Sequence, residues 1–281
     1  EGQRERCYRL QQLTAEKYSW ELTASETLKA YKTILAKREA PTPTVSESKS
    51  TPCNFPNAIF DVTECENDID LQWLNVITWA PVWMTRSERL MLFSLIYSLR
   101  PERYLEIGVY KGGSTLITCA ALDSLGSSGK MFCVDIERQV DPEKWGKVKH
   151  RAELIIGSSP EILPNVVTMA GGTFDFALVD GDHRYESVIR DAEGVAPYIS
   201  PGGYVLFHDA YNDGVGQAIE DFARRHSENF HDLGFITRET TRGTSPDGLP
   251  AQWGGLRLVQ KKQININQTS PKVIDGCNSS R

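Results

Sequence analysis

The sequence predicts an α/β protein built on a mostly parallel sheet with helices on both faces. From residue 103 onward, short apolar runs alternate with stretches of helical periodicity, which is the pattern of β-α-β units. Three of these runs end in glycines or acidic residues, and open parallel sheets bind ligands beyond the carboxyl ends of their strands. The 281 residues are enough to bury a core of ordinary domain size. We therefore expect an enzyme with one shared crevice.

The expected elements follow in order after a helix at 87–99. Strands are expected at 103–108, 130–135, 152–156, 174–180 and 203–208, and helices at 113–124, 159–168, 184–197 and 215–227. Two further strand-like segments, 232–238 and 254–260, flank a loop rich in Gly, Ser and Pro. This arrangement predicts an antiparallel hairpin that closes the sheet.

The rest of the chain divides by composition. Residues 1–39 have a helical pattern, and 40–57 form a linker whose many Pro, Ser and Thr residues cannot bury enough apolar surface to fold alone. The main domain is expected at 58–262, followed by a disordered tail at 263–281. Three tryptophans precede the first strand. Packing in the core is the favoured role for them, and lining the crevice stays open. The three tryptophans are Trp73, Trp79 and Trp83.

Composition excludes several functions. The formal charge of -6 and the lack of a basic run argue against a nucleic-acid surface. The longest apolar segment, 90–99, is too short to span a membrane, and no signal peptide is recognised, so a cytoplasmic location is expected. The six cysteines show no zinc-ligand spacing and are expected to be reduced thiols. Three histidines are expected to be structural: His150, His226 and His231. The sequence leaves the oligomeric state open, including a homo-oligomer.

The segment 103–115 is the most informative stretch, because closely spaced glycines follow an apolar run where a helix should begin. Gly108, Gly112 and Gly113 allow a tight turn and a close approach to a ligand, and Ser114 can cap the next helix. The spacing does not fit the dinucleotide fingerprint, which needs glycine at the first, third and sixth positions. It predicts a different small-molecule cradle.

Acidic residues and histidines end the later strands. Asp135 follows one strand, while Asp180, Asp182 and His183 follow another, and a third strand ends in His208 and Asp209. Adjacent parallel strands end at the same edge, so we expect the last two groups to form one reactive cluster.

The pattern Glu106-x-Gly108-x-x-x-Gly112-Gly113-Ser114 resembles motif I of class I S-adenosylmethionine-dependent methyltransferases. The segments 179–191 and 201–209 are similar to the branch that contains macrolide-sugar O-methyltransferases and cephalosporin-hydroxylase-like proteins. This resemblance covers about 87–260 and implies a Rossmann-like, seven-stranded sheet. It also implies transfer of a methyl group from S-adenosylmethionine to a hydroxyl.

The resemblance implies the following roles. Glu106 and the glycines would hold the methionine part of the cofactor, Asp135 the ribose hydroxyls, and the segment at Ser158 the adenine. The implied cofactor-binding set is Glu106, Gly108, Gly112, Ser114, Asp135, Ser158 and Asp180.

The expected catalytic residues are His183 and Asp180, with His183 as general base because imidazole titrates near neutral pH. A Mg²⁺ ion bound by Asp180, Asp209 and His208 would make the acceptor hydroxyl more acidic. Metal-dependent relatives carry two adjacent acids at the later position, whereas this chain has His208 and Asp209. The sequence therefore leaves the metal open.

Residues 1–38 resemble the C-terminal tail of group 1 glycosyltransferases of the GT-B type, through a Trp-Glu pair followed by a Leu and Tyr stripe. This implies fusion to a glycosyltransferase and favours a sugar or glycan acceptor. Two alternatives stay open. The segment can be an amphipathic arm, and the main domain can be a non-catalytic or hydroxylase-associated module attached to a glycosyltransferase.

Overall fold

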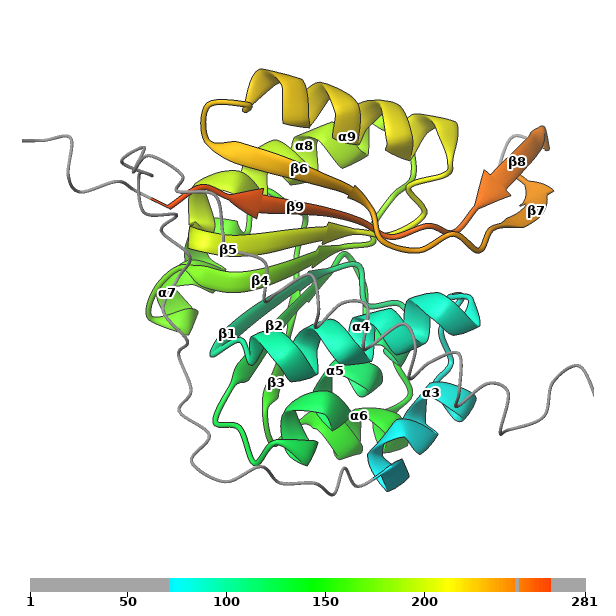
Figure 1. The fold of residues 1–281 in the computed structure, drawn as a ribbon. Helices are drawn as coiled ribbons and strands as arrows, with labels where there is room; N and C mark the ends of the chain where they lie inside the picture. The colour runs from blue at the N-terminus through cyan, green and yellow to red at the C-terminus, as the bar shows by residue number, and fades with distance from the viewer. Residues whose placement is uncertain (1–70, 246–247, 264–281) are drawn as a thin grey trace, which may run out of the picture. The chain divides into compact units, whose positions relative to one another are not determined.

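A computed structural model describes residues 71–245 and 248–263 of the chain. Its centre is a seven-stranded sheet with the order β3-β2-β1-β4-β5-β9-β6 (Figure 1). Strands β1 to β5 pair in parallel with one another, while β9 is antiparallel to both β5 and β6. Strands β2 and β3 are added on one side of β1, and β4 and β5 on the other side. At such a switch point the carboxyl ends of the two adjacent strands, β1 and β4, border a crevice. This is the Rossmann-like methyltransferase fold that the sequence predicts.

The first four strands agree closely with the expected ranges, whereas the fifth begins four residues earlier than expected and the last three residues later. The seven strands of this sheet are named in chain order. They are β1 (Arg103–Ile107), β2 (Lys130–Asp135), β3 (Ala152–Ile156), β4 (Phe174–Val179), β5 (Ile199–Phe207), β6 (Phe230–Phe235) and β9 (Arg257–Lys261). A small separate hairpin, β7 (Thr241–Thr244) and β8 (Pro250–Trp253), pairs antiparallel in the segment expected to be a loop. It was missed because its Gly, Ser and Pro content is typical of turns.

Helices cover the sheet on both sides (Figure 1). One side carries the 3₁₀ turn η1 (Leu71–Asn75) and the helices α3 (Val76–Trp79), α4 (Arg86–Leu99), α5 (Gly113–Ser124) and α6 (Pro142–Val148). The other carries α7 (Leu163–Ala170), α8 (Tyr185–Val195) and α9 (Asp213–Arg225), with a 3₁₀ turn η2 (Ala196–Tyr198) before β5. No described helix is long and apolar enough to cross a membrane.

Each face of the sheet has its own core, because side chains of a strand alternate between faces. On β1, Leu105 and Ile107 pack in the cluster beneath α7, α8 and α9, whereas Tyr104 packs in the cluster beneath α4 and α5. Tyr104 is fully buried and stacks on Phe176, with ring centroids 5.9 Å apart. Parallel strands buried on both faces read as continuous apolar runs, which explains why the sequence identified them.

Helix boundaries differ where local signals were misread. Helix α6 was missed, although Asp141 caps it by accepting from the backbone N–H groups of Glu143 and Lys144 and Pro142 opens it. Helix α7 begins at Leu163, four residues after the expected start. Helix α4 begins at Arg86 with a capping box between Thr85 and Glu88. The helical segment 1–39, the linker 40–57 and the tail from 264 lie outside the described residues.

Candidate active site

One cavity of about 710 Å³ lies at the carboxyl ends of β1, β2, β3, β4 and β5. Its wall includes most of the residues singled out from the sequence: Gly108, Ser114, Asp135, Ser158, Asp180, Asp182, His183, His208 and Asp209. Its volume falls within the range of small-molecule sites, about 300–1,000 Å³. Two expected cofactor ligands, Glu106 and Gly112, are not part of this wall.

Only glycine fits at position 108. Its φ is +90°, and a Cβ atom at this position would lie 2.1 Å from the carbonyl oxygen of Asp180. Its own N–H donates to the carbonyl of Val134 at 2.9 Å. The bare backbone at Gly108 therefore lets the ends of β1, β2 and β4 meet at the cavity floor.

Glu106 acts behind the wall rather than in it. Its fully buried carboxylate accepts hydrogen bonds from the Ser114 hydroxyl and, at 2.8 Å, from Thr115 Oγ1. Burial raises the pKa of Glu106 to about 7, against the opposing effect of these two hydroxyls. Glu106 thus ties the start of α5 to β1 and orients Ser114. Gly112, with φ +76°, is the residue that lets the chain enter this helix.

Asp135 is held firmly on the cavity wall at the end of β2. Its Oδ2 accepts from the backbone N–H groups of Val109 and Tyr110, both at 2.8 Å, and its Oδ1 from that of Glu137 at 3.2 Å. A carboxylate has about four acceptor sites, so capacity remains for ligand hydroxyls. The side chain is therefore oriented before any ligand binds.

Two histidines and two aspartates form a compact cluster at the ends of β4 and β5. His208 Nδ1 lies 3.0 Å from Asp180 Oδ1 and 3.2 Å from Asp209 Oδ2, and its side chain is only 3% exposed. His183 Nε2 lies 2.8 Å from Asp209 Oδ2. The cluster expected from the sequence is therefore present, except that Asp182 turns away to Arg184 and to Ser187 Oγ at 2.8 Å.

Charge in this cluster is balanced internally. Burial opposes a charge on His208, but the attraction of Asp180 and hydrogen bonds to Asp180 and Asp209 raise its pKa well above the usual value. Burial likewise lowers the pKa of His183, and the hydrogen bond and charge of Asp209 outweigh it, so the net shift is upward. The pKa of Asp209 is correspondingly held well below its usual range, despite burial, by the two histidines.

The ligand atoms best placed for a cation differ from the expected set. Asp180, His183 and Asp209 offer atoms within 4.8 Å of one another, with His183 in the place expected for His208. His208 instead lies between the two carboxylates as a proton donor. Because one donor is a nitrogen and His208 already engages both acids, this set is a poor match for Mg²⁺, which prefers oxygen ligands in an octahedron.

Two acidic residues of the site were not found from the sequence. Glu88 on α4 is fully buried, accepts from the backbone N–H of Gly255, and places Oε2 3.6 Å from His208 Nε2. Asp191 on α8 lines the cavity, and burial raises its pKa to about 6. The Thr85–Glu88 capping box marks Glu88 only as a helix start, and Asp191 lies inside an amphipathic helix, so neither position signals a functional site.

The expectation that the three tryptophans pack in the core was wrong, since Trp73 is 38% exposed and Trp79 and Trp83 are exposed as well. The side chain of Trp83 is 86% exposed and also lines the cavity beside Tyr110, with ring centroids 5.6 Å apart. Trp79 is 44% exposed and is not part of the cavity wall. A third indole, Trp253 on β8, meets His183 edge-on at 5.1 Å. Two aromatic side chains, Trp83 and Tyr110, therefore line the cavity, and a third, Trp253, contacts His183.

Comparison with known proteins is consistent with this geometry. Residues 105–210 match a family described as a methyltransferase domain. The chain is 29% identical over 175 residues to the uncharacterized protein y4gI of Sinorhizobium fredii, an alignment that spans 54% of this chain but 19% of that protein. It is 22% identical over 179 residues to a rhamnosyl O-methyltransferase of Mycobacterium leprae, covering 57% of this chain and 76% of that protein.

Among solved structures, the chain is similar to the O-methyltransferase TomG from Streptomyces achromogenes in complex with S-adenosylmethionine, with a TM-score of 0.49 and 17% identity. That match covers 68% of this chain and 86% of the other.

The cavity fits S-adenosylmethionine in two respects. Gly108 leaves room at the cavity floor, and the carboxylate of Asp135 is already oriented on the wall. Residues 105–210 match a methyltransferase domain, and the described part of the chain has the Rossmann-like fold of such domains.

Proposed function

We propose that this chain methylates a hydroxyl group of a sugar or glycan, with S-adenosylmethionine as donor. The observation that carries the proposal is the His183–Asp209 pair, with 2.8 Å between Nε2 and Oδ2, in the same cavity as Asp135. Bound S-adenosylmethionine supplies an electrophilic methyl group on a sulfonium. The protein must hold an acceptor hydroxyl in line with it and remove the hydroxyl proton.

In this proposal, His183 receives the proton. Asp209 Oδ2 lies 2.8 Å from Nε2, and we assign Nδ1 as the ring nitrogen that accepts the proton. His208 pairs with Asp180 and offsets its charge next to His183. Glu106, hydrogen-bonded to Ser114, keeps the start of α5 in place. The hydroxyl oxygen bonds to the methyl carbon, and the electron pair of the broken carbon–sulfur bond stays on sulfur.

The sugar acceptor is supported by two features. One curated relative is a rhamnosyl O-methyltransferase, and an exposed indole at the cavity, Trp83, offers an apolar face of the kind that carbohydrate rings pack on. The resemblance of residues 1–38 to a glycosyltransferase tail points to the same class of acceptor and to a fused transferase.

The direct test is incubation of the purified chain with S-adenosylmethionine and a panel of glycosides, including rhamnosides, and of simple phenols. Mass spectrometry should detect one added methyl group on a glycoside. Methylation of phenols alone would contradict the acceptor class. Calorimetric binding of the cofactor without methylation of any acceptor would favour the hydroxylase-associated alternative, and failure to bind it would favour the non-catalytic module.

Replacement of Trp83 by alanine is expected to raise the acceptor KM by about tenfold, because loss of an aromatic contact costs about 0.5–1.5 kcal/mol beyond its buried area. The affinity for S-adenosylmethionine should change little. Steady-state kinetics with a glycoside acceptor measures both. Trp79→Ala is the matched control, since Trp79 is also exposed but lies outside the cavity wall. Equal effects of the two changes would exclude Trp83 as an acceptor platform.

Activity is expected to survive chelation of divalent cations. His208 carries positive charge between Asp180 and Asp209, which is the role that a bound cation would otherwise have. Dialysis against a chelator, followed by rate measurements with and without added Mg²⁺ or Mn²⁺, checks this. Loss of activity that returns with one of these ions would instead assign Asp180, His183 and Asp209 as its ligands.

A further inference from the structure

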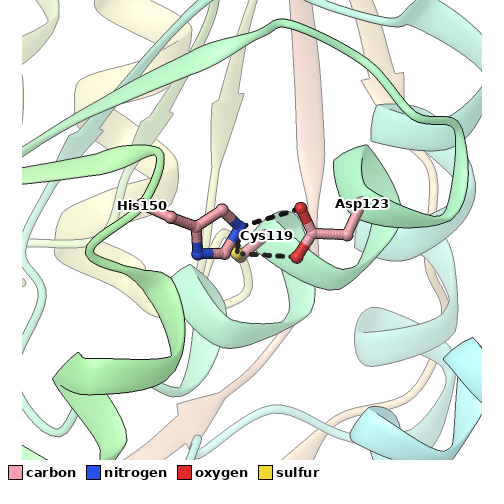
Figure 2. A group of neighbouring side chains, drawn as sticks. All are labelled: Cys119, Asp123 and His150. Carbon is pink, nitrogen blue, oxygen red and sulfur yellow. Dashed lines mark hydrogen bonds and ion pairs between the residues drawn. The ribbon is translucent and has the colours of Figure 1, made fainter.

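A second cluster of chemically reactive side chains lies outside the cavity wall. Cys119 and Asp123 are four residues apart on α5 and therefore share one face of the helix. His150 lies in the turn between α6 and β3 and points toward both (Figure 2). None of the three lines the cavity described above. The packing of α5 against the segment before β3 thus brings sulfur, oxygen and nitrogen donors to one point.

The separations among these donor atoms fit a tetrahedral metal site. Cys119 Sγ lies 3.4 Å from Asp123 Oδ2 and 3.9 Å from His150 Nε2, and His150 Nε2 lies 3.0 Å from Asp123 Oδ1. With zinc–ligand bonds of about 2.0–2.3 Å, tetrahedral geometry places sulfur about 3.5–3.6 Å from the other donors and nitrogen about 3.3 Å from oxygen. Cys119 contacts Oδ2 of Asp123 and His150 contacts Oδ1, so the side chains would have to adjust until one oxygen faces both partners. One donor atom from each residue already lies within 4.8 Å of the others.

Neighbouring groups already hold the ligands in place. Arg151 donates to Asp123 Oδ1 through Nε at 2.8 Å and Nη2 at 2.5 Å, and through Nη1 to the carbonyls of Ser127 and Gly129. Lys130 Nζ donates to the His150 carbonyl at 3.1 Å. Such outer contacts orient ligands in metal sites. They leave Asp123 Oδ2 facing the thiol of Cys119.

We propose that Cys119, Asp123 and His150 bind a Zn²⁺ ion, with solvent at the fourth position. Sulfur, imidazole nitrogen and carboxylate oxygen together are a donor set for zinc rather than for Mg²⁺ or Ca²⁺. His150 is half exposed, which provides an entry route and an outer coordination position, whereas Cys119 is buried. Binding releases the thiol proton to solvent, and thiolate and carboxylate together neutralise the ion.

Without a metal, Cys119 is not a reactive thiolate. Burial, followed by the charge of Asp123, raises the pKa of Cys119 to about 12, so the free side chain is a neutral thiol at physiological pH. A bound cation stabilises the thiolate directly. The site would link α5 to the start of β3, and zinc would therefore stabilise the fold at a distance from the methyl-transfer cavity.

Cobalt titration of the metal-free full chain tests this proposal. Co²⁺ bound to a thiolate gives a sulfur-to-metal charge-transfer absorption in the near ultraviolet, which Asp180, His183 and Asp209 cannot produce because they contain no sulfur. We expect this band to saturate at one Co²⁺ per chain and to disappear when Zn²⁺ is added in excess. Zinc at a hundredfold excess over its Kd should also raise the midpoint of thermal unfolding by about 5–10 °C.

Three variants make the test specific. Cys119→Ser should abolish the band, and His150→Ala, a change at an exposed position, should weaken Co²⁺ binding by more than about tenfold. Cys133→Ser, at the other buried cysteine of the described residues, should leave the band unchanged. Circular dichroism of each metal-free variant verifies its folding. Absence of the band in the wild-type chain, or its persistence in Cys119→Ser, would overturn the proposal.

Discussion

Asp135→Ala should weaken the binding of S-adenosylmethionine by about ten- to a hundredfold. A hydrogen bond to a charged group contributes about 1.5–3 kcal/mol, and each 1.4 kcal/mol is a factor of ten in affinity. The change also removes the acceptor for the N–H groups of Val109 and Tyr110, each 2.8 Å from Oδ2. The loop above Gly108 therefore loses its anchor. Calorimetric titration with the cofactor measures this effect.

Two further variants separate the causes. Asp135→Asn keeps an oxygen acceptor for the loop but loses the charge, so its affinity should lie between those of the wild type and the alanine variant. Glu137→Gln is the control, because Glu137 lies two residues further along but outside the cavity wall. If Asp135→Ala bound the cofactor as tightly as the wild type, the proposed ribose contact would be wrong.

His183→Ala is expected to lower kcat by about 10²- to 10⁴-fold, the usual contribution of a general base. The Kd for S-adenosylmethionine should stay nearly unchanged, since the proposed role of His183 is toward the acceptor. His231→Ala, an exposed histidine on β6 outside the cavity wall, is the matched control. Comparable turnover in His183→Ala and wild type would remove His183 from the mechanism.

The pH profile of the rate gives an independent readout. A base must be unprotonated to act, so the rate should rise with pH through the pKa of His183. Asp209 shifts that pKa upward against the effect of burial, so the midpoint should lie above that of an ordinary histidine. In Asp209→Asn the upward influence is lost, and the midpoint should move to lower pH. If the midpoint did not move in Asp209→Asn, the rise of the rate with pH would not report the titration of His183 beside Asp209.

The sequence was most informative where one local pattern decides the structure. Strand β2 matches its expected range because a strand buried on both faces is a continuous apolar run. The start of α5 was found because Gly112 and Gly113 mark the turn before it. Conversely, the β7–β8 hairpin was missed because its residues favour turns when read without their cross-strand partners.

Functional residues were harder to assign than elements. Asp135, Asp180 and His183 end strands at the same edge, so topology alone brings them to one cavity. The burial of Glu106 behind Ser114 and Thr115, by contrast, depends on how α5 packs on β1. The exposure of Trp83 depends on the path of the segment between α3 and α4, which hydrophobicity does not encode.

By itself, the sequence determined where the first four strands lie along the chain, the glycine turn and the acids that end β2 and β4, because each depends on neighbours within a few residues. Only the tertiary structure decided that His208 lies between Asp180 and Asp209 while His183 pairs with Asp209. It also decided that His150 meets Cys119, 31 positions away along the chain. These contacts arise from the packing of separate elements, and no local spacing of residues records them.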